Sequence, residues 1–438
     1  MLHRETVREY LRHDSGPLKP LLGYCGLAAG KVAWARGKRD LGLRLFAALH
    51  SANLSTHVDH SIESWIRAQL TRRAPAFLQA LGDFVQRYGS GGSLAPHLQD
   101  PLRMLGSRIV ILKKAQPREK GVVLLGYSYV FPLFARMFDV GSVADRYHIV
   151  LEPSWCGLCA LEVLSFTQYD FPVFVECWEP KDAKFLAGID SNLIPVPLAD
   201  NWWVDHRVFK PDPAARKDID VIMVAAWARF KRHRQFFKAL RELKRHGKRL
   251  RVALVGYAVD RSKTDILMEA DAFGIRDWLE LHEDLSPTDV VRLLNRSKVH
   301  VLWSRNEGAN RAHVEAMFVG VPSIVHDGFN FGYRQPHVNA QTGAYATEAE
   351  LPDVLVRMIE KYEDFSPREW VLENMSCQRA TSILGASLRE HSIANGEKWS
   401  ETLAVKTVLL GTQRYWDPDD ADRFREDYRF LESRILAG

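Results

Sequence analysis

The chain has 438 residues, of which 46% are apolar and 26% are charged, so it is long enough for two or three ordinary domains. This composition excludes a disordered or collagen-like chain, and five cysteines are too few for a disulfide framework at this length. No run approaches the roughly 18 uncharged apolar residues that a membrane-spanning helix needs. The N-terminal residues lack the apolar segment of a secretion signal, so a reducing cytoplasm is the expected compartment.

Positive charge is concentrated in the first quarter of the chain. The whole chain carries +5, whereas residues 1–99 hold thirteen Lys and Arg against seven Asp and Glu, which gives +6. Such a region can attract an anionic membrane surface or an anionic acceptor, and the alternative is a solvated helical surface. No nucleic-acid-binding motif accompanies the charge, so no nucleic-acid partner is predicted. The expected location is the cytoplasm, either free or at the inner face of the membrane.

The first hundred residues are predicted to be helical. Apolar side chains recur at helical spacing over 41–49 and again over 77–85. The segment 89–93, Gly-Ser-Gly-Gly-Ser, is the one linker-like stretch of the sequence and predicts a boundary. We therefore expect a helical N-terminal region over residues 1–100.

After this segment the pattern changes to short apolar runs separated by helical patterns, which is typical of parallel strands buried on both faces. The first series of runs covers 109–112, 122–125, 149–151, 173–175 and 193–196. A polar link separates it from a second series at 219–224, 252–255, 278–281, 299–303 and 323–325. The sequence thus predicts two doubly wound α/β domains, over 101–210 and 211–385, that face each other across a cleft. Residues 386–438 are predicted to be helical and can cross back to the first domain.

The stretch 303–322 carries the clearest chemical pattern. A strand ends, Glu307 and Gly308 form a turn, and Asn310 is a good N-cap for the helix that follows. The unpaired N–H groups and the positive dipole end of that helix point back toward the strand end, which makes an anion site. Glu307 in the turn and Glu315 in the helix place two carboxylates where they can accept hydrogen bonds from sugar hydroxyls. On its own, this pair also fits an ordinary capped helix with a solvated glutamate.

The whole frame of strand, Glu-Gly, Glu-Ala-Met, Gly-x-Pro and strand resembles the E-x7-E signature of retaining GT-B glycosyltransferases of family 4. The resemblance covers about 193–347, and it implies a GT-B fold with two Rossmann-like domains facing a cleft. It also implies that Glu315 binds the ribose hydroxyls of a nucleotide sugar and that Glu307 contacts the transferred sugar. The donor-binding residues implied in this way are Glu315, Gly308, Asn310, Arg311 and Gly256.

The cations that bind the pyrophosphate in this family are only partly matched. Lys231 stands at the position of the family's lysine, but Ala226 stands where its arginine is expected. Arg229 is our hypothesis for the missing cation, because fixed cations stabilise the charge of a departing nucleoside diphosphate. The alternative is a solvated, basic start of a helix. Asn310 is a second departure, since the family usually has a glycine there.

Two further motifs suggest other chemistry. Cys156 and Cys159 have the C-x-x-C spacing of a thioredoxin-type redox site, although the proline usual between the cysteines is absent. No second cysteine pair completes a zinc site. Asp218 and Asp220 imitate a metal-binding D-x-D, but they fall at the amino end of their strand. The sequence therefore predicts no metal and no resident cofactor.

These patterns lead to one principal interpretation. The chain is expected to move a sugar from a nucleotide-diphosphate donor to a hydroxyl acceptor, a glycan or a lipid-linked glycan, with retention and without a metal. The expected catalytic residues are Glu307, Lys231 and Arg229. Two alternatives stay open, namely an epimerase or phosphorylase of the same fold and a non-catalytic nucleotide-sugar-binding protein.

Overall fold

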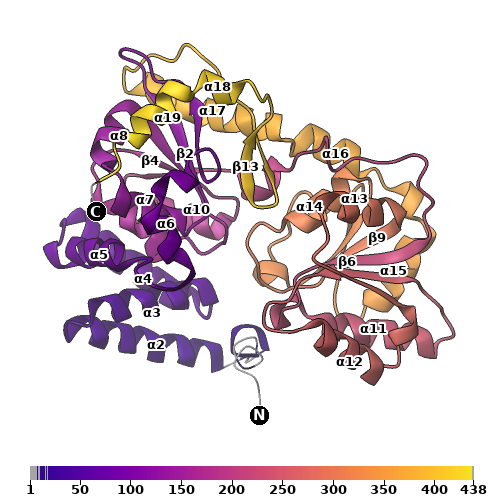
Figure 1. Cartoon of the computed structure of the whole chain (residues 1–438). Coiled ribbons are helices and arrows are strands. Elements are labelled where there is room, and N and C mark those ends of the chain that lie inside the picture. Colours follow the sequence, from indigo (N-terminus) through magenta and orange to yellow (C-terminus); the bar gives the residue numbers. More distant parts are fainter. Residues whose placement is uncertain (1–6, 8–9, 15, 17, 437–438) are drawn as a thin grey trace. The chain divides into compact units, whose positions relative to one another are not determined.

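The structure is a computed structural model that describes residues 7, 10–14, 16 and 18–436 (Figure 1). The chain forms two compact units. We call the unit that contains Val204–Ser376 unit 1, and the unit made of Leu11–Trp203 and Cys377–Gly438 unit 2. The sequence predicted domain limits at 1–100, 101–210, 211–385 and 386–438, and these limits stay a prediction.

Unit 2 contains a five-stranded sheet in the order β1-β2-β3-β4-β5. Its strands are β1 (Ile109–Lys113), β2 (Gly121–Gly126), β3 (Tyr147–Glu152), β4 (Val173–Glu176) and β5 (Leu193–Val196). All five lie where the apolar runs predicted them. The pairs from β2 to β5 are parallel, with Val123 opposite Ile149 and Ile149 opposite Val173.

The expectation of an entirely parallel first sheet is wrong at its edge, because β1 pairs with β2 in antiparallel orientation. The connection between these two strands covers only residues 114–120. A parallel crossover needs a dozen or more residues, whereas a short connection returns the chain in the opposite direction.

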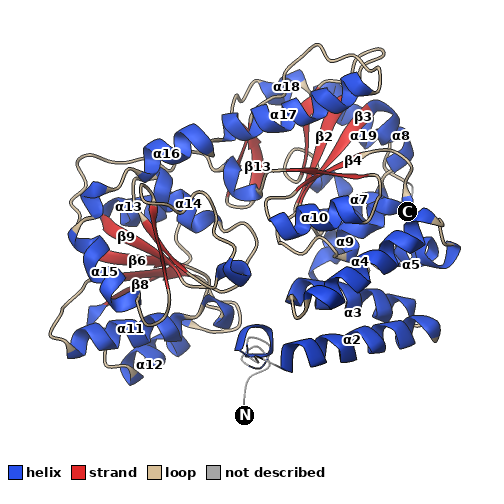
Figure 2. Ribbon diagram, turned by 180° about the vertical axis from the view of Figure 1, so that it is seen from behind, coloured by secondary structure: helices blue, strands red, loops and turns tan. Residues whose placement is uncertain are grey.

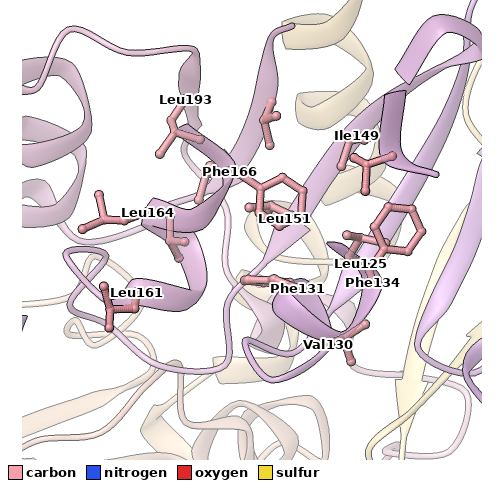
Figure 3. Close-up of a cluster of buried hydrophobic side chains, with 14 of the residues drawn as sticks. Leu125, Val130, Phe131, Phe134, Ile149, Leu151, Leu161, Leu164, Phe166 and Leu193 are labelled. Carbon is pink, nitrogen blue, oxygen red and sulfur yellow. The ribbon is translucent and has the colours of Figure 1, made fainter. Parts of the chain in front are cut away.

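Helices cover both faces of the unit 2 sheet. Alternate strand residues point to opposite faces, so Val123 and Leu125 join one buried cluster while Val122 and Leu124 join another. Figure 3 shows the first cluster, in which Phe131 and other side chains of helix α7 lie against the strands. The helices before and between the strands are α2 (Leu18–Ala35), α3 (Arg39–Ala52), α4 (Thr56–Thr71), α5 (Pro75–Arg87), α6 (Ala95–Gln99), α7 (Val130–Met137), α8 (Val140–Arg146), α9 (Leu161–Leu164) and α10 (Pro180–Gly188).

The helical prediction for the first hundred residues is confirmed over the described part of that region. Phe46, Ile66, Phe77 and Phe84, from helices α3 to α5, belong to the same buried cluster as the strand residue Ile149. The N-terminal helices and the sheet therefore share one core, and the Gly-Ser segment at 89–93 lies inside unit 2.

The second cluster of unit 2 is completed by the C-terminal part of the chain. Helix α17 (Cys377–Ala394) places Ala380, Leu384 and Leu388 in the cluster that contains Val122 and Val150 of the sheet. The expectation that the end of the chain is helical throughout is wrong, because an antiparallel hairpin follows α17. The remaining elements are β12 (Lys406–Leu409), β13 (Thr412–Tyr415), α18 (Asp420–Arg423) and α19 (Arg425–Glu432).

Unit 1 contains a six-stranded parallel sheet in the order β11-β10-β9-β6-β7-β8 (Figure 2). Its strands are β6 (Ile219–Val224), β7 (Val252–Gly256), β8 (Leu279–Glu283), β9 (Ser297–Leu302), β10 (Ser323–His326) and β11 (Gly343–Ala346). Its helices are α11 (His233–Arg245), α12 (Lys263–Ala272), α13 (Pro287–Arg296), α14 (Arg311–Phe318), α15 (Leu351–Glu360) and α16 (Pro367–Asn374). The sequence predicted the first five strands but not β11.

The two units together confirm the predicted class, a mixed α/β protein with parallel sheets, an N-terminal helical region and C-terminal helices. Among the described helices, none combines the length and the apolar character needed to cross a bilayer.

Candidate functional site

The candidate site lies at the carboxyl ends of β6 and β9, which are neighbours in the unit 1 sheet. The strand order reverses here, since β7 and β8 follow β6 on one side while β10 and β11 follow β9 on the other. Such a reversal opens a crevice beyond the strand ends, and this is where ligands bind in doubly wound sheets. The loop 225–232 after β6 and the turn 303–310 after β9 carry most of the predicted site residues.

Glu307 is the centre of the polar cluster at these strand ends. The Lys231 ammonium donates to its Oε2 at 2.5 Å, and the Asn310 amide donates to the same oxygen at 2.8 Å. The Ser304 hydroxyl donates to the other carboxylate oxygen. The side chains of Lys231 and Glu307 are only 11% and 7% exposed. The structure therefore brings Lys231, Glu307 and Asn310 together in one buried, charged group.

Asn310 connects this group to helix α14. It is the N-cap of that helix, and its Oδ1 accepts from the backbone N–H of His313 at 3.2 Å. Its side-chain amide simultaneously donates to Glu307, so one residue satisfies a helix end and a carboxylate. The predicted N-cap is confirmed, and Gly320 follows the helix with φ of +84°, as expected at a helix stop.

A pair of buried histidines, one of them in the first turn of α14, form a hydrogen bond with each other. The Nε2 atoms of His313 and His337 are 2.8 Å apart, so one ring donates and the other accepts. Burial lowers the pKa of His337 to about 3 and, helped by the neighbouring ring, lowers the pKa of His313 well below its ordinary value. Both rings are therefore neutral at pH 7. The first turn of α14 thus contains one member of an uncharged, hydrogen-bonded histidine pair.

The aromatic segment 327–334 holds the Glu307 turn from another side. The Asn330 side chain accepts from the Glu307 backbone N–H at 3.0 Å, and the Asn330 backbone N–H donates to the Arg305 carbonyl at 2.6 Å. Asn330 and Phe331 adopt left-handed backbone conformations, with φ of +43° and +60°. Asn330 and the neighbouring Phe329 are buried, so these two residues support the turn.

The other predicted residues of the motif lie on or next to α14. Glu315 is partly buried in the helix, and burial raises the pKa of its carboxyl while Arg311 pulls that pKa down. Arg311 is the first residue of the helix and is partly exposed, whereas Gly308 is buried in the turn beside Glu307. Glu315 shares the helix, but no direct bond, with the Lys231–Glu307 group.

Arg229 and Gly256 lie at the ends of β6 and β7. The backbone N–H of Arg229 donates to Asp260 at 3.0 Å, and its guanidinium is 3.8 Å from the same carboxylate and 40% exposed. A Cβ on Gly256 would lie 2.3 Å from the Ala225 carbonyl oxygen, so close approach of two backbones already requires glycine here. Gly256 thus has a packing role, whatever its contact with a donor.

The structure also shows two cations that sequence reasoning missed. Arg232 and Arg305 both reach Oε1 of Glu348, the second at 3.6 Å. Arg232 is buried, follows Lys231 directly and adopts φ of +60° at the start of α11. Arg305 lies between Ser304 and Glu307. The basic run after Lys231 was the signal for Arg232, whereas the pairing with Glu348 depends on the fold.

The carboxyl edge of the unit 2 sheet carries a second buried charged group. Glu152, at the end of β3, forms an ion pair with Lys406 at 2.5 Å and accepts a hydrogen bond from the Gln413 amide at 3.0 Å. Burial, together with the charge of Glu152, raises the pKa of Glu176 well above its ordinary value. The hairpin β12–β13 therefore places Lys406 and Gln413 against Glu152 at the carboxyl end of β3.

The structure also shows the surroundings of the C-x-x-C and D-x-D motifs, which suggested redox and metal chemistry. Burial raises the pKa of the Cys159 thiol, whereas a reactive cysteine has a lowered pKa. The Asp182 carboxylate accepts hydrogen bonds from the backbone N–H groups of Gly157 and Leu158, next to this cysteine. Asp218 pairs with Arg296 at 2.9 Å, so it is engaged at the amino end of β6. No grouping of three or more metal-binding side chains occurs among the residues that the structure describes.

Comparison with known proteins identifies the region that contains this site. Residues 206–369 match the family model described as "Glycosyl transferases group 1". The match lies within unit 1 and includes Lys231, Glu307, Asn310 and Glu315. The match supports the prediction that the chain is a glycosyltransferase. Among curated proteins, none has a sequence that matches the chain significantly.

Several solved structures resemble parts of the chain at low sequence identity. TarM is 14% identical with a TM-score of 0.45, over 56% of this chain and 50% of that one. Sucrose-phosphate synthase from Thermosynechococcus elongatus is 15% identical with a TM-score of 0.46, over 57% of this chain and 69% of that one. HepE from Anabaena, in complex with UDP and glucose, is 12% identical with a TM-score of 0.47, over 71% of this chain and 84% of that one. The chain spans about half the length of the TarM chain that it matches.

Proposed function

We propose that the chain is a GT-B glycosyltransferase that transfers a sugar from a nucleotide-diphosphate donor to a hydroxyl acceptor with retention. The observation that carries the proposal is the Lys231–Glu307–Asn310 group, which lies at the strand-order reversal and at the start of α14. A buried ammonium and the N-terminus of a helix are both attractive to a diphosphate. The group lies within the residues that match the glycosyltransferase model.

In this proposal the donor diphosphate lies between Lys231 and the first N–H groups of α14. Glu307 holds Lys231 in position, so the ammonium needs little reorganisation to meet the diphosphate. As the sugar–phosphate bond breaks, negative charge grows on the departing diphosphate, and Lys231 stabilises that charge. Gly308 and Arg311, at the start of α14, and Gly256, at the end of β7, border the same donor site.

Glu307 and Glu315 take the sugar and the ribose. Glu307 has its two oxygens oriented by Ser304, Lys231 and Asn310, which fixes the carboxylate for contact with the transferred sugar. Glu315 lies farther along the same helix, four residues beyond Arg311, and in this proposal its carboxylate accepts hydrogen bonds from the ribose hydroxyls.

We further propose that Arg229 acts from the more exposed side of the diphosphate and that Arg305 adds a cation that Ala226 does not provide. Arg229 is 40% exposed and 3.8 Å from Asp260, so its guanidinium is loosely held. Arg305 is 16% exposed and is 3.6 Å from Glu348. With these cations, charge neutralisation comes from the chain, and transfer is expected to persist in the presence of a metal chelator.

Titration calorimetry with UDP, GDP and ADP tests the donor site. UDP is the first choice because HepE was crystallised with UDP and with UDP-glucose. Replacing Glu315 with Ala removes charged hydrogen bonds to the ribose and should weaken nucleotide binding by about 10- to 100-fold. The matched control is Glu360→Ala at the end of α15, where the side chain is 64% exposed, and it should leave binding unchanged. Equal affinity of Glu315→Ala and the wild type would refute the ribose assignment.

The reaction itself distinguishes the remaining alternatives. A transferase should slowly release the nucleoside diphosphate from its donor without acceptor, whereas a non-catalytic binding protein should not. An epimerase would instead change the configuration of the donor sugar. NMR of the product anomer tests retention, and an inverted product would contradict that part of the proposal.

A further inference from the structure

Helix α2 exposes large apolar side chains along most of its length. Leu18, Leu21, Leu22, Tyr24 and Val32, which we call the α2 face, are between 36% and 59% exposed. The spacing of the four aliphatic residues places them on one side of the helix. Continuous apolar surface of this kind on a soluble protein marks an interaction site.

The inward side of α2 explains why these residues point outward. The buried residues of the helix are small or few, namely Gly23, Leu27, Gly30 and Ala33. A Cβ on Gly30 would lie 2.5 Å from the Phe46 ring. The helix therefore approaches its neighbours mainly with small residues and presents three of its four leucines to the solvent, which reverses the usual arrangement of a surface helix.

The stretch of chain that forms α2 carries charge of a single sign. Between residues 15 and 39 the chain holds five cations and no Asp or Glu, the cations being Lys19, Lys31, Arg36, Lys38 and Arg39. Lys31 is exposed and directly precedes Val32, and Arg36 is exposed at the end of the helix. Two copies of the chain joined through this face would bring two basic segments together, whereas an anionic surface would attract each of them.

We propose that the α2 face binds the surface of an anionic lipid bilayer. The helix lies in the plane of the headgroups, with its leucines among the upper acyl carbons and its cations against lipid phosphates. The 18-residue helix contains Pro20 and Lys31 and is not apolar enough to span a membrane, so it lies on the bilayer. This contact gives the basic first quarter of the sequence a defined location, and it does not depend on transfer activity.

Vesicle flotation of the full chain tests the proposal, with phosphatidylcholine vesicles that contain phosphatidylglycerol and with pure phosphatidylcholine vesicles. The wild type should float with the anionic vesicles and much less with the neutral ones. The double variant Leu21→Gln, Val32→Gln should bind at least about tenfold more weakly, because two buried apolar contacts are lost. The double variant Lys31→Gln, Arg36→Gln should bind about 25-fold more weakly, since each cation near the surface is worth about fivefold.

A matched control replaces two equally exposed apolar residues elsewhere. Met268 and Ile393 are 65% and 56% exposed, and the variant Met268→Gln, Ile393→Gln should float like the wild type. Circular dichroism establishes that all variants are folded, which is expected because every replaced side chain is at the surface. Equal binding of wild type and α2 variants, or no flotation of the wild type, would overturn the proposal. A dimer in light scattering that Leu21→Gln, Val32→Gln converts to monomers would also overturn it, because a second copy would then cover the face.

Discussion

The ion pair between Lys231 and Glu307 provides the sharpest test of the site. Replacing Lys231 with Met keeps the volume of the side chain but leaves the Glu307 carboxylate buried without its cation. Breaking a buried pair in this way costs about 3–5 kcal/mol. The expected loss lies at the lower end of that range, because Ser304 and Asn310 still donate to the carboxylate.

A double-mutant cycle separates the pair from its surroundings. Glu307→Gln removes the charge but keeps a side-chain acceptor for Asn310, so the double variant contains no uncompensated charge. We expect the double variant to be more stable than Lys231→Met alone, with a coupling free energy of about 2–3 kcal/mol. Under the proposed function, in which Lys231 and Glu307 both contact the donor, the two single variants should also lose nucleotide binding.

The loss of stability in each variant is measured by amide hydrogen exchange of peptides from β6 and β9, which reports on this part of unit 1. Global unfolding is less suitable because the two units need not unfold in a single step. The control is Lys248→Met, whose pair with Glu360 spans 4.0 Å between side chains that are 50% and 64% exposed. That exposed pair should contribute less than about 1 kcal/mol. A loss in Lys231→Met no larger than in Lys248→Met, or strictly additive effects in the cycle, would refute the reasoning.

Two further predictions concern the stability of unit 1. The neutral, buried rings of His313 and His337 have pKa values below those of the unfolded chain, so the unfolded state binds more protons in acid. The stabilisation is fully present above about pH 6.5 and is lost as the pH falls, for His337 down to its pKa of about 3, by up to about 1.4 kcal/mol per pH unit. His337→Gln should reduce the slope of stability against pH measured by urea unfolding. Gly343→Ala places a Cβ 2.0 Å from the Ser323 carbonyl oxygen and should destabilise β11 by more than about 2 kcal/mol, seen as faster exchange there. Gly91→Ala, with open space around its Cβ, should be neutral, and equal effects of the two substitutions would contradict the packing argument.

Most of the strands that the sequence predicted are runs of large apolar residues buried on both faces, and the exception is the edge strand β8, whose residues are only partly buried or exposed. Strand β11 has the sequence Gly-Ala-Tyr-Ala, and its glycine is required by close contact with β10. Strand β12 begins with Lys406 and Thr407, both fully buried. Neither pattern resembles a buried strand, because the partner that explains each residue lies far away in the sequence. The antiparallel direction of β1, by contrast, follows from the length of its connection.

The candidate site also contains residues that the local sequence predicts and residues that only the fold brings together. Glu307, Asn310 and the start of α14 could be predicted because the turn, the cap and the helix are local features of consecutive residues. The meeting of Lys231 with Glu307 needed the family resemblance, since 76 residues separate the two. Arg232 and Arg305 were missed because Glu348, which draws them together, carries no local signal of its role.

The path of the chain through the two units has a consequence for biosynthesis. Unit 2 is interrupted by Val204–Ser376, the larger part of unit 1, and helix α17, which completes the cluster over Val122 and Val150, begins only at Cys377. Because the ribosome makes the chain from its N-terminus, one face of the unit 2 sheet stays exposed until most of the chain has been synthesised. The Val204–Ser376 part of unit 1 is continuous in sequence and can fold before synthesis ends, so the sheet of unit 2 should be the last part of the protein to be covered.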